Sequence, residues 1–199
     1  MEKIVLTRKA QITEVAKNMF RQQGYAATSM RDLAREIGIE PASLYSHIRS
    51  KEELLSNICF KIGADFFEAF HEIETITDPA ARLTAAIKGH VAVIVNNLDA
   101  SAVFLHEWRF LSEPNLSEFK SQRDRYESYF RALIREGIEG GIFKKQDEKF
   151  IVLTIFSSLN WIYEWYKPEG SMCAEDIGQK LSELILEGLK TQHINVNKN

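Results

Sequence analysis

The sequence predicts an all-α protein of about nine helices, in which a small helix-turn-helix domain precedes a larger helical domain. Of its 199 residues, 45% are hydrophobic and 27% are charged, and just 4 prolines and 10 glycines interrupt the chain. Apolar residues recur at three- and four-residue spacing over most of its length, which is the period of an amphipathic helix. Two short runs of this kind are joined by a turn at Gly38. These three observations favour a globular bundle of helices.

The first two helices are delimited by glycine. Apolar residues at helical spacing predict a helix over 8–23, and Gly24 follows it as a stop signal. Thr28 and Ser29 offer side-chain oxygens that can cap a second helix over 30–37, which ends at Gly38. The second helix is therefore two turns long.

The next two helices follow after a short connection. A third is predicted over 41–48, with Leu44 and Ile48 facing the core. Ser50 begins a capping box, so a long helix is expected over 50–72. Four helices thus fit within about seventy residues, and the tight pair in the middle has the form of a helix-turn-helix.

The outer face of the third helix carries the groups that DNA contacts need. Ser43, Tyr45 and His47 can donate hydrogen bonds to phosphates or base edges, and Thr28 and Lys51 stand where helix amino ends could meet phosphate. Two helices joined by a glycine-containing turn also occur in ordinary helical bundles. In that case Tyr45 would be a surface aromatic residue and His47 a solvated histidine. Periodicity by itself leaves both interpretations open.

The residues from Thr28 to Ala34, then Gly38 and Ile39, then Ser43 to Leu54 resemble the DNA-binding signature of the TetR/AcrR regulators. The resemblance covers about residues 5–60 and departs from the family pattern at Glu40, Pro41, Ala42 and Ile48. It implies a DNA-binding domain over 1–50, an effector-binding and dimerisation domain over 51–192, and a tail over 193–199 that we expect to fray. The implied DNA contacts are Thr28, Ser29, Ala42, Ser43, Tyr45, His47 and Lys51.

The larger half is predicted as five helices, over 80–98, 100–111, 115–139, 147–166 and 174–190. The helix over 147–166 is apolar on more than one side, so it needs neighbours all round. With the last helix it could form a four-helix homodimer interface, as the resemblance implies, or complete the core of a monomer.

A small-molecule effector site is the other feature that the resemblance implies. We expect its walls among the aromatic residues of the middle helices, although most such rings serve simply as core in any bundle. The predicted ligand-binding residues are Phe66, Phe70, His90, Phe104, Trp108, Tyr126 and Phe130. Residues 43–48 and 161–170 are similar to a TetR subgroup that responds to acyl-coenzyme A thioesters, which suggests an apolar or aromatic effector of that kind.

Composition excludes several other classes. Residues 1–60 hold 9 Lys+Arg against 7 Asp+Glu and the rest holds 16 against 21, so a small basic face on an acidic protein is expected. Cys59 and Cys173 lack metal-site spacing, and no signal or membrane-length apolar run is present, which predicts a cytoplasmic protein without a disulfide framework.

Catalysis is not predicted. His71 with Glu68 could ligate a metal, but the sequence has no HExxH, phosphate loop or nucleophile elbow, so neither an enzyme, a metal site nor a cofactor is expected. The expected function is a ligand-responsive repressor that binds a palindromic operator. The alternative is a helical protein-interaction module that lacks specific DNA binding.

Overall fold

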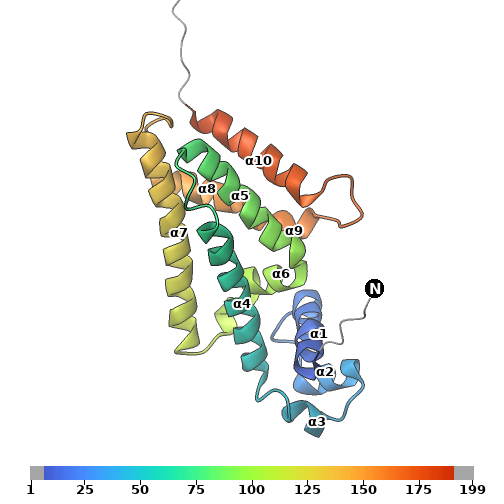
Figure 1. The fold of residues 1–199 in the computed structure, drawn as a ribbon. Helices are drawn as coiled ribbons and strands as arrows, with labels where there is room; N and C mark the ends of the chain where they lie inside the picture. The colour runs from blue at the N-terminus through green and yellow to red at the C-terminus, as the bar shows by residue number, and fades with distance from the viewer. Residues whose placement is uncertain (1–6, 191–199) are drawn as a thin grey trace, which may run out of the picture. The chain divides into compact units, whose positions relative to one another are not determined.

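The computed structural model describes residues 7–190, and this part of the chain is built from helices (Figure 1). In order they are α1 Arg8–Gln23, α2 Met30–Ile37, α3 Pro41–Tyr45, α4 Lys51–His71, α5 Pro79–Asn96, α6 Leu98–His106, the 3-10 helix η1 Glu107–Phe110, α7 Asn115–Glu139, α8 Glu148–Asn160, α9 Ile162–Trp165 and α10 Ala174–Leu189. The predicted all-α fold is confirmed. The expected tail over 193–199 lies outside the described residues.

The helices group into two compact units. The first comprises the described residues up to Asp65 together with Asn96–Arg123, and the second comprises Phe66–Val95 together with the described residues from Asp124 onward. The helices α4 and α7 each contribute to both. Helical segments from the middle of the chain thus pack with the amino-terminal helices in one unit. The functional boundary between residues 50 and 51 stays a prediction.

Local sequence explains where α1 and α2 begin and end. The Thr7 hydroxyl accepts a hydrogen bond from the Ala10 amide, and Ser29 forms a reciprocal capping box with Asp32. Gly38 ends α2 in the left-handed conformation, with φ 73°, which favours a residue without a side chain. The predicted bounds of both helices are confirmed.

Helix α3 is shorter than the predicted 41–48. After Tyr45 the chain tightens: the Ser46 amide bonds to the Ser43 carbonyl at 3.2 Å and the Ser46 hydroxyl donates to the same oxygen at 2.7 Å. A serine that bonds back to the backbone competes with the next helical turn, so the regular helix stops. The turn that follows still places Ile48 in the core, where it is 1% exposed.

Two other predicted helices are interrupted. The run over 100–111 begins earlier, as α6, and finishes as η1. The run over 147–166 breaks at Trp161, which separates α8 from α9, and α9 ends at Trp165 because Pro168 disfavours helical backbone before it. Apolar periodicity does not detect such interruptions, since the side chains keep their faces across a tightened turn.

A close approach inside the second unit depends on Gly137 of α7. Phe143, which is buried, lies so close that a Cβ atom on residue 137 would overlap its ring. We therefore expect Gly137→Ala to lower the free energy of unfolding by about 2–3 kcal/mol, the typical cost of overpacking a dense core. Denaturant unfolding measures this change. Gly188→Ala is the matched control, because nothing surrounds that position in α10 and alanine should be neutral or stabilising there.

Candidate DNA-reading surface and effector site

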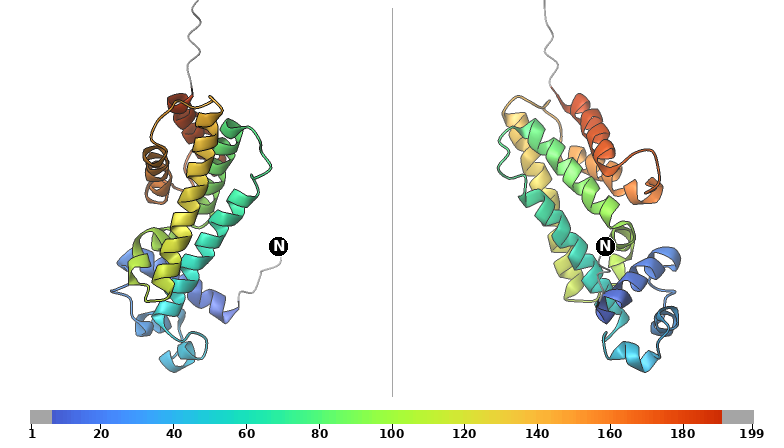
Figure 2. Two further views of the ribbon diagram at one scale, coloured as in Figure 1. Left: turned by 90° about the vertical axis from the view of Figure 1, so that its left-hand side faces the viewer. Right: turned by 45° about the vertical axis from the view of Figure 1, so that its right-hand side comes forward.

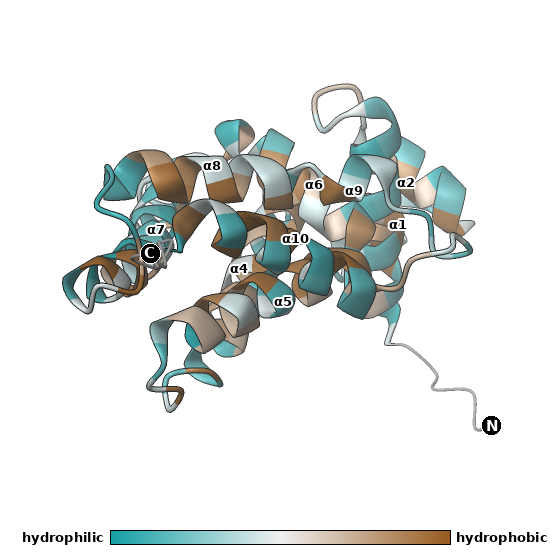
Figure 3. Cartoon of the chain, turned by 90° about the horizontal axis from the view of Figure 1, so that it is seen from above, coloured by the Kyte–Doolittle hydropathy of each residue, from teal (hydrophilic) through white to brown (hydrophobic). Residues whose placement is uncertain are grey.

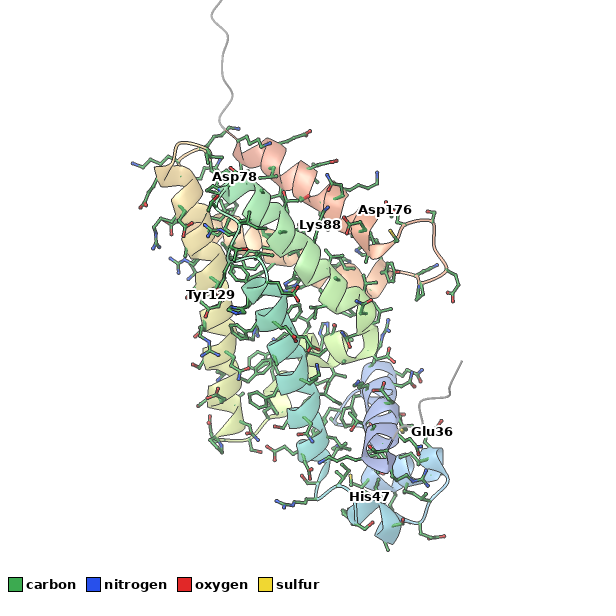
Figure 4. All side chains as sticks on the ribbon, viewed as in Figure 1. Glu36, His47, Asp78, Lys88, Tyr129 and Asp176 are labelled. Carbon is green, nitrogen blue, oxygen red and sulfur yellow. The ribbon has the colours of Figure 1, made fainter. Side chains whose placement is uncertain are left out.

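Helix α3 and the turn after it are buried on one side and exposed on the other. Leu44 is fully buried, whereas Ala42, Ser43 and His47 are exposed and Tyr45 is 54% exposed. Figure 2 gives two views of this amino-terminal region, and Figure 4 labels His47 on the turn that follows α3. The predicted DNA-contacting residues of this segment are therefore exposed, and the buried Leu44 holds the segment against the core.

The two predicted contacts at the start of α2 differ in their surroundings. Ser29 is exposed and caps the helix, as expected. Thr28 is 1% exposed, its hydroxyl donates to the Gly24 carbonyl at 2.9 Å, and it accepts a hydrogen bond from Gln23 at 3.1 Å. The Thr28 hydroxyl thus stabilises the loop between α1 and α2 and is not presented to a phosphate.

Lys51 is bound within the protein. Its ammonium donates to the carbonyls of Tyr25 and Thr28, both at 2.7 Å, and lies 4.1 Å from the centroid of the Tyr25 ring. Partial burial lowers the pKa of Lys51. Two of its three donors are therefore occupied in joining the start of α4 to the loop between α1 and α2.

The same loop is tied to the segment around η1, within the first unit. The Tyr25 amide donates to Glu107 Oε2 at 3.2 Å, and the Tyr25 ring lies 5.2 Å from that of Phe110. Nearby, Arg21 pairs with Asp99 of α6 at 2.6 Å. These contacts fix the helix-turn-helix to residues that lie about eighty positions later in the chain.

Five of the seven predicted effector residues meet in the second unit. Phe66, Phe70, His90, Tyr126 and Phe130 form one network of ring contacts, with centroid separations from 4.3 Å to 6.1 Å. Three further rings belong to this network, namely Phe67, Tyr129 and Phe156. Phe67 was among the aromatic residues expected to line the site, whereas Tyr129 and Phe156 were missed. A helical projection of α7 could have found Tyr129, since it adjoins the predicted Phe130 in sequence.

Phe104 and Trp108 belong to the other unit. They pack on Phe119, at 5.0 Å and 5.7 Å, and the guanidinium groups of Arg109 and Arg123 lie 4.8 Å and 5.2 Å from the Trp108 ring. The predicted effector set is thus divided between two clusters, because residues that lie on consecutive turns of α7 contribute to different units.

His90 is the polar centre of the larger cluster. Its ring stacks on Phe66, its Nδ1 lies 3.2 Å from the Tyr126 hydroxyl, and its Nε2 lies 3.1 Å from Oδ1 of Asn160. Burial lowers the pKa of His90 to about 4, so the imidazole is neutral at pH 7. Because an amide oxygen can only accept, Nε2 carries the proton, and the Tyr126 hydroxyl donates to Nδ1.

Two arginines near the reading surface were not among the predicted contacts. Arg31, the second residue of α2, and Arg49, just before α4, are both exposed. Their charge and their position beside capped helix starts were visible in the sequence. Both arginines lie within the segments that resemble the family signature, but the DNA contacts implied by the resemblance did not include them.

Comparison with known proteins identifies the family. Residues 12–58 match the family described as bacterial regulatory proteins, tetR family, and residues 77–189 match the tetracyclin repressor-like C-terminal domain. The HTH-type transcriptional repressor KstR2 of Mycolicibacterium smegmatis is 26% identical over 186 residues, which cover 92% of this chain and 91% of the relative. The chain belongs to the TetR family.

Solved structures of TetR-family proteins have the same fold. The ketosteroid transcriptional regulator KstR2 of Mycobacterium tuberculosis superimposes with a TM-score of 0.89 at 26% identity, covering 94% of this chain and 97% of the other. PfmR of Thermus thermophilus gives 0.81 at 33% identity, covering 91% and 100%. AibR, solved with isovaleryl coenzyme A and operator DNA, gives 0.79 at 24% identity, covering 89% and 97%. This TetR-family chain is accordingly a DNA-binding transcriptional regulator and not an enzyme.

One face of this TetR-family protein is apolar and uncovered. Phe150 of α8 and Leu184 of α10 are each 68% exposed, and Leu153 and Trp161 are also exposed. Figure 3 shows the hydrophobic residues along α8. The hydroxyl of Ser157 bonds to a carbonyl of its own helix at 2.7 Å, so it presents little polarity to a neighbour. Such a face is suited to packing against other helices.

Residues 7–190 contain neither a candidate metal site nor a membrane-spanning helix. No group of three or more His, Cys, Asp or Glu side chains is placed to hold a metal ion there, and His71 instead pairs with Glu74 at 3.0 Å. None of the helices in this range is long and apolar enough to cross a bilayer.

Proposed function

We propose that this protein is a homodimeric repressor that binds a near-palindromic operator and is released from it by an apolar or aromatic acyl-coenzyme A thioester. The exposed face of α3 above a buried Leu44 carries this proposal. It presents Ser43 and Tyr45 from a helix that the core holds in place, and His47 is exposed on the turn that follows. Ala42 adds a methyl group that suits contact with a thymine methyl.

Dimerisation is the second part of the proposal. The exposed apolar residues of α8 and α10 suit a four-helix interface with a second copy, and a two-fold dimer would place two recognition helices about one DNA turn apart, roughly 34–36 Å. A protein of this kind acts where the chromosome lies, so we place it in the cytoplasm. The free thiols of Cys59 and Cys173 agree with a reducing compartment.

The effector site is the aromatic network around His90. Its rings supply the apolar walls that small-molecule sites have, and His90 with Tyr126 and Asn160 supplies polar groups that could orient a ligand. The name of KstR2 associates that relative with ketosteroids, and AibR was solved with an acyl-coenzyme A. An effector must bind the DNA-free conformation more tightly than the DNA-bound one, since equal affinity shifts no population.

Fluorescence anisotropy tests the proposal directly. The purified chain is titrated against labelled DNA from upstream of its own gene, with a shuffled duplex as the reference, and then with a panel of acyl-coenzyme A thioesters. We expect tight binding to the upstream DNA, release by one thioester class, and at least about a tenfold loss of affinity in Tyr45→Ala, as for one lost base contact.

Other outcomes of this experiment are equally informative. Specific binding that no thioester releases would remove the proposed effector and keep the repressor. Equal binding to both duplexes would contradict operator recognition and favour an interaction module that uses the apolar face of α8 and α10.

A further inference from the structure

The imidazole of His90 uses both of its nitrogen atoms within the protein. The side chain is 3% exposed, its Nδ1 accepts a hydrogen bond from the Tyr126 hydroxyl, and its Nε2–H donates to Oδ1 of Asn160. Burial keeps the imidazole neutral at pH 7 by lowering its pKa, so Nε2 has a single proton to offer. A ligand atom that accepts a hydrogen bond can therefore reach this proton only by replacing Asn160.

Asn160 is held less firmly than the two groups beside it. His90 and Tyr126 lie in the interior of α5 and α7, and their rings are packed among other rings. Asn160 is half-buried and is the last residue of α8, which breaks immediately afterwards at Trp161. The last turn of a helix is held by fewer backbone hydrogen bonds than its interior. Asn160 is therefore the partner that can be exchanged at the smallest cost.

The surroundings of His90 Nε2 suit an acyl carbonyl. The rings of Phe66 and Phe156 stack on the imidazole with centroid separations of 4.3 Å and 5.8 Å, so a chain attached to the incoming group would lie against apolar walls. Because Nε2 is a donor, the incoming atom must be an acceptor, which excludes an amine or another group that only donates. A coenzyme A thioester carries a carbonyl oxygen joined directly to its acyl chain.

The same region attaches α8 to the aromatic network. Phe156 and Asn160 lie one helical turn apart, and Phe156 also stacks on Tyr126 at 5.8 Å. Trp161, the next residue along the chain, is 59% exposed and belongs to the apolar face for which we propose dimerisation. Loss of the bond between Asn160 and His90 would remove one attachment of the helix that carries this face.

We propose that the carbonyl oxygen of the effector replaces Oδ1 of Asn160 at His90 Nε2, and that the release of Asn160 couples effector binding to the apolar face of α8. The two partners of Nε2 exclude each other, so the exchange gives the ligand a different affinity for the two arrangements. A carbonyl that left Asn160 in place would not by itself favour either arrangement. This inference rests on the effector class of the proposed function.

The role of the carbonyl is tested by comparing acyl-coenzyme A thioesters with S-alkyl coenzyme A analogues of equal chain length, in which a methylene replaces the carbonyl. Anisotropy of the operator complex gives the concentration of each ligand that releases half of the DNA. For the wild-type chain, the analogue should require at least about tenfold more than the thioester, since it cannot accept the proton of His90. In His90→Phe the two concentrations should be equal, because a phenyl ring has no such proton.

The exchange itself is tested by Asn160→Ala. This variant should need about fivefold less thioester for half release than the wild-type chain, because no partner has to be displaced, and its response to the analogue should be unchanged. Ser158→Ala is the matched control. Ser158 is an exposed polar residue of the same helix whose hydroxyl bonds to the Thr154 carbonyl at 3.2 Å, so its removal should leave both responses as in the wild-type chain.

Two results would overturn the inference and leave the proposed function intact. One is weaker release of Asn160→Ala by the thioester, which would mean that Asn160 itself holds the ligand. The other is equal release of the wild-type chain by thioester and analogue. Release of the wild-type chain by neither ligand would contradict the proposed effector, and the exchange at His90 would be overturned with it.

Discussion

A chain that carries both Phe150→Glu and Leu184→Glu is expected to be monomeric and to bind its operator at least about 100-fold more weakly than the wild-type chain. Both side chains are 68% exposed, so charge at these positions should leave the fold of one protomer intact. Between two copies, however, four carboxylates would be removed from water without partners. Because paired recognition helices gain about 10² to 10⁴ in avidity, a monomer loses that factor.

Sedimentation equilibrium measures the association, and anisotropy measures the affinity for DNA. Ala132→Glu is the control for an added surface charge, since it introduces one glutamate at an exposed apolar position of α7. The control should stay dimeric. If the double variant sedimented as a dimer with wild-type affinity, the interface would have to lie elsewhere on the molecule.

The stability of the protein is expected to fall by about 3 kcal/mol as the pH decreases from about 6.5 to 4, through His90 alone. Burial lowers the pKa of His90 from 6.5 to about 4. In this interval the unfolded chain therefore binds a proton that the folded chain excludes, which favours unfolding. The neutral imidazole stabilises the fold fully above pH 6.5, and this contribution is lost as the pH falls through the folded pKa. One pKa unit corresponds to about 1.4 kcal/mol, so the shift of the His90 pKa from 6.5 to about 4 accounts for the expected loss of about 3 kcal/mol by pH 4.

Denaturant unfolding at several pH values, at one protein concentration, tests this expectation. His90→Gln should be less stable at pH 7, because the stacking on Phe66 is lost, but its stability should depend less on pH between 6.5 and 4. All other titrating groups are common to the two chains, so they cancel in the difference. An unchanged pH dependence in the variant would show that His90 is not the buried titrating group.

The fold could be predicted from the sequence because the signals that begin and end its helices are local. Gly24, Gly38 and the capping box at Ser29 act within a few residues of themselves, so α1 and α2 could be bounded without knowledge of their neighbours. Breaks that depend on backbone details were missed. The helix bounds were predicted from the spacing of apolar residues. The tightened turn after Tyr45 and the interruption at Trp161 leave that spacing unchanged.

The candidate site was predicted less completely, for a different reason. Exposure of Tyr45 and His47 follows from helical phase, and the prediction placed both on the outer face. The engagement of Lys51 with two carbonyls and the burial of Thr28 arise from contacts between segments, which a linear sequence does not contain. The same limit applies to the effector residues, since Trp108 and Tyr126 are both aromatic residues on helical stripes and yet pack in different units.

The bonds from Arg21 to Asp99 and from Tyr25 to Glu107 limit the exchange of the helix-turn-helix segment between related proteins. A chimera that transplants residues 1–50 alone onto another scaffold would leave behind the acidic partners that hold it, and its recognition helix would be mounted on a foreign surface. A graft that includes α6 and η1 would keep these matched pairs together. We therefore expect that residues 1–50 cannot be exchanged between relatives by themselves, and that the operator preference is transferred only when α6 and η1 are transferred with them.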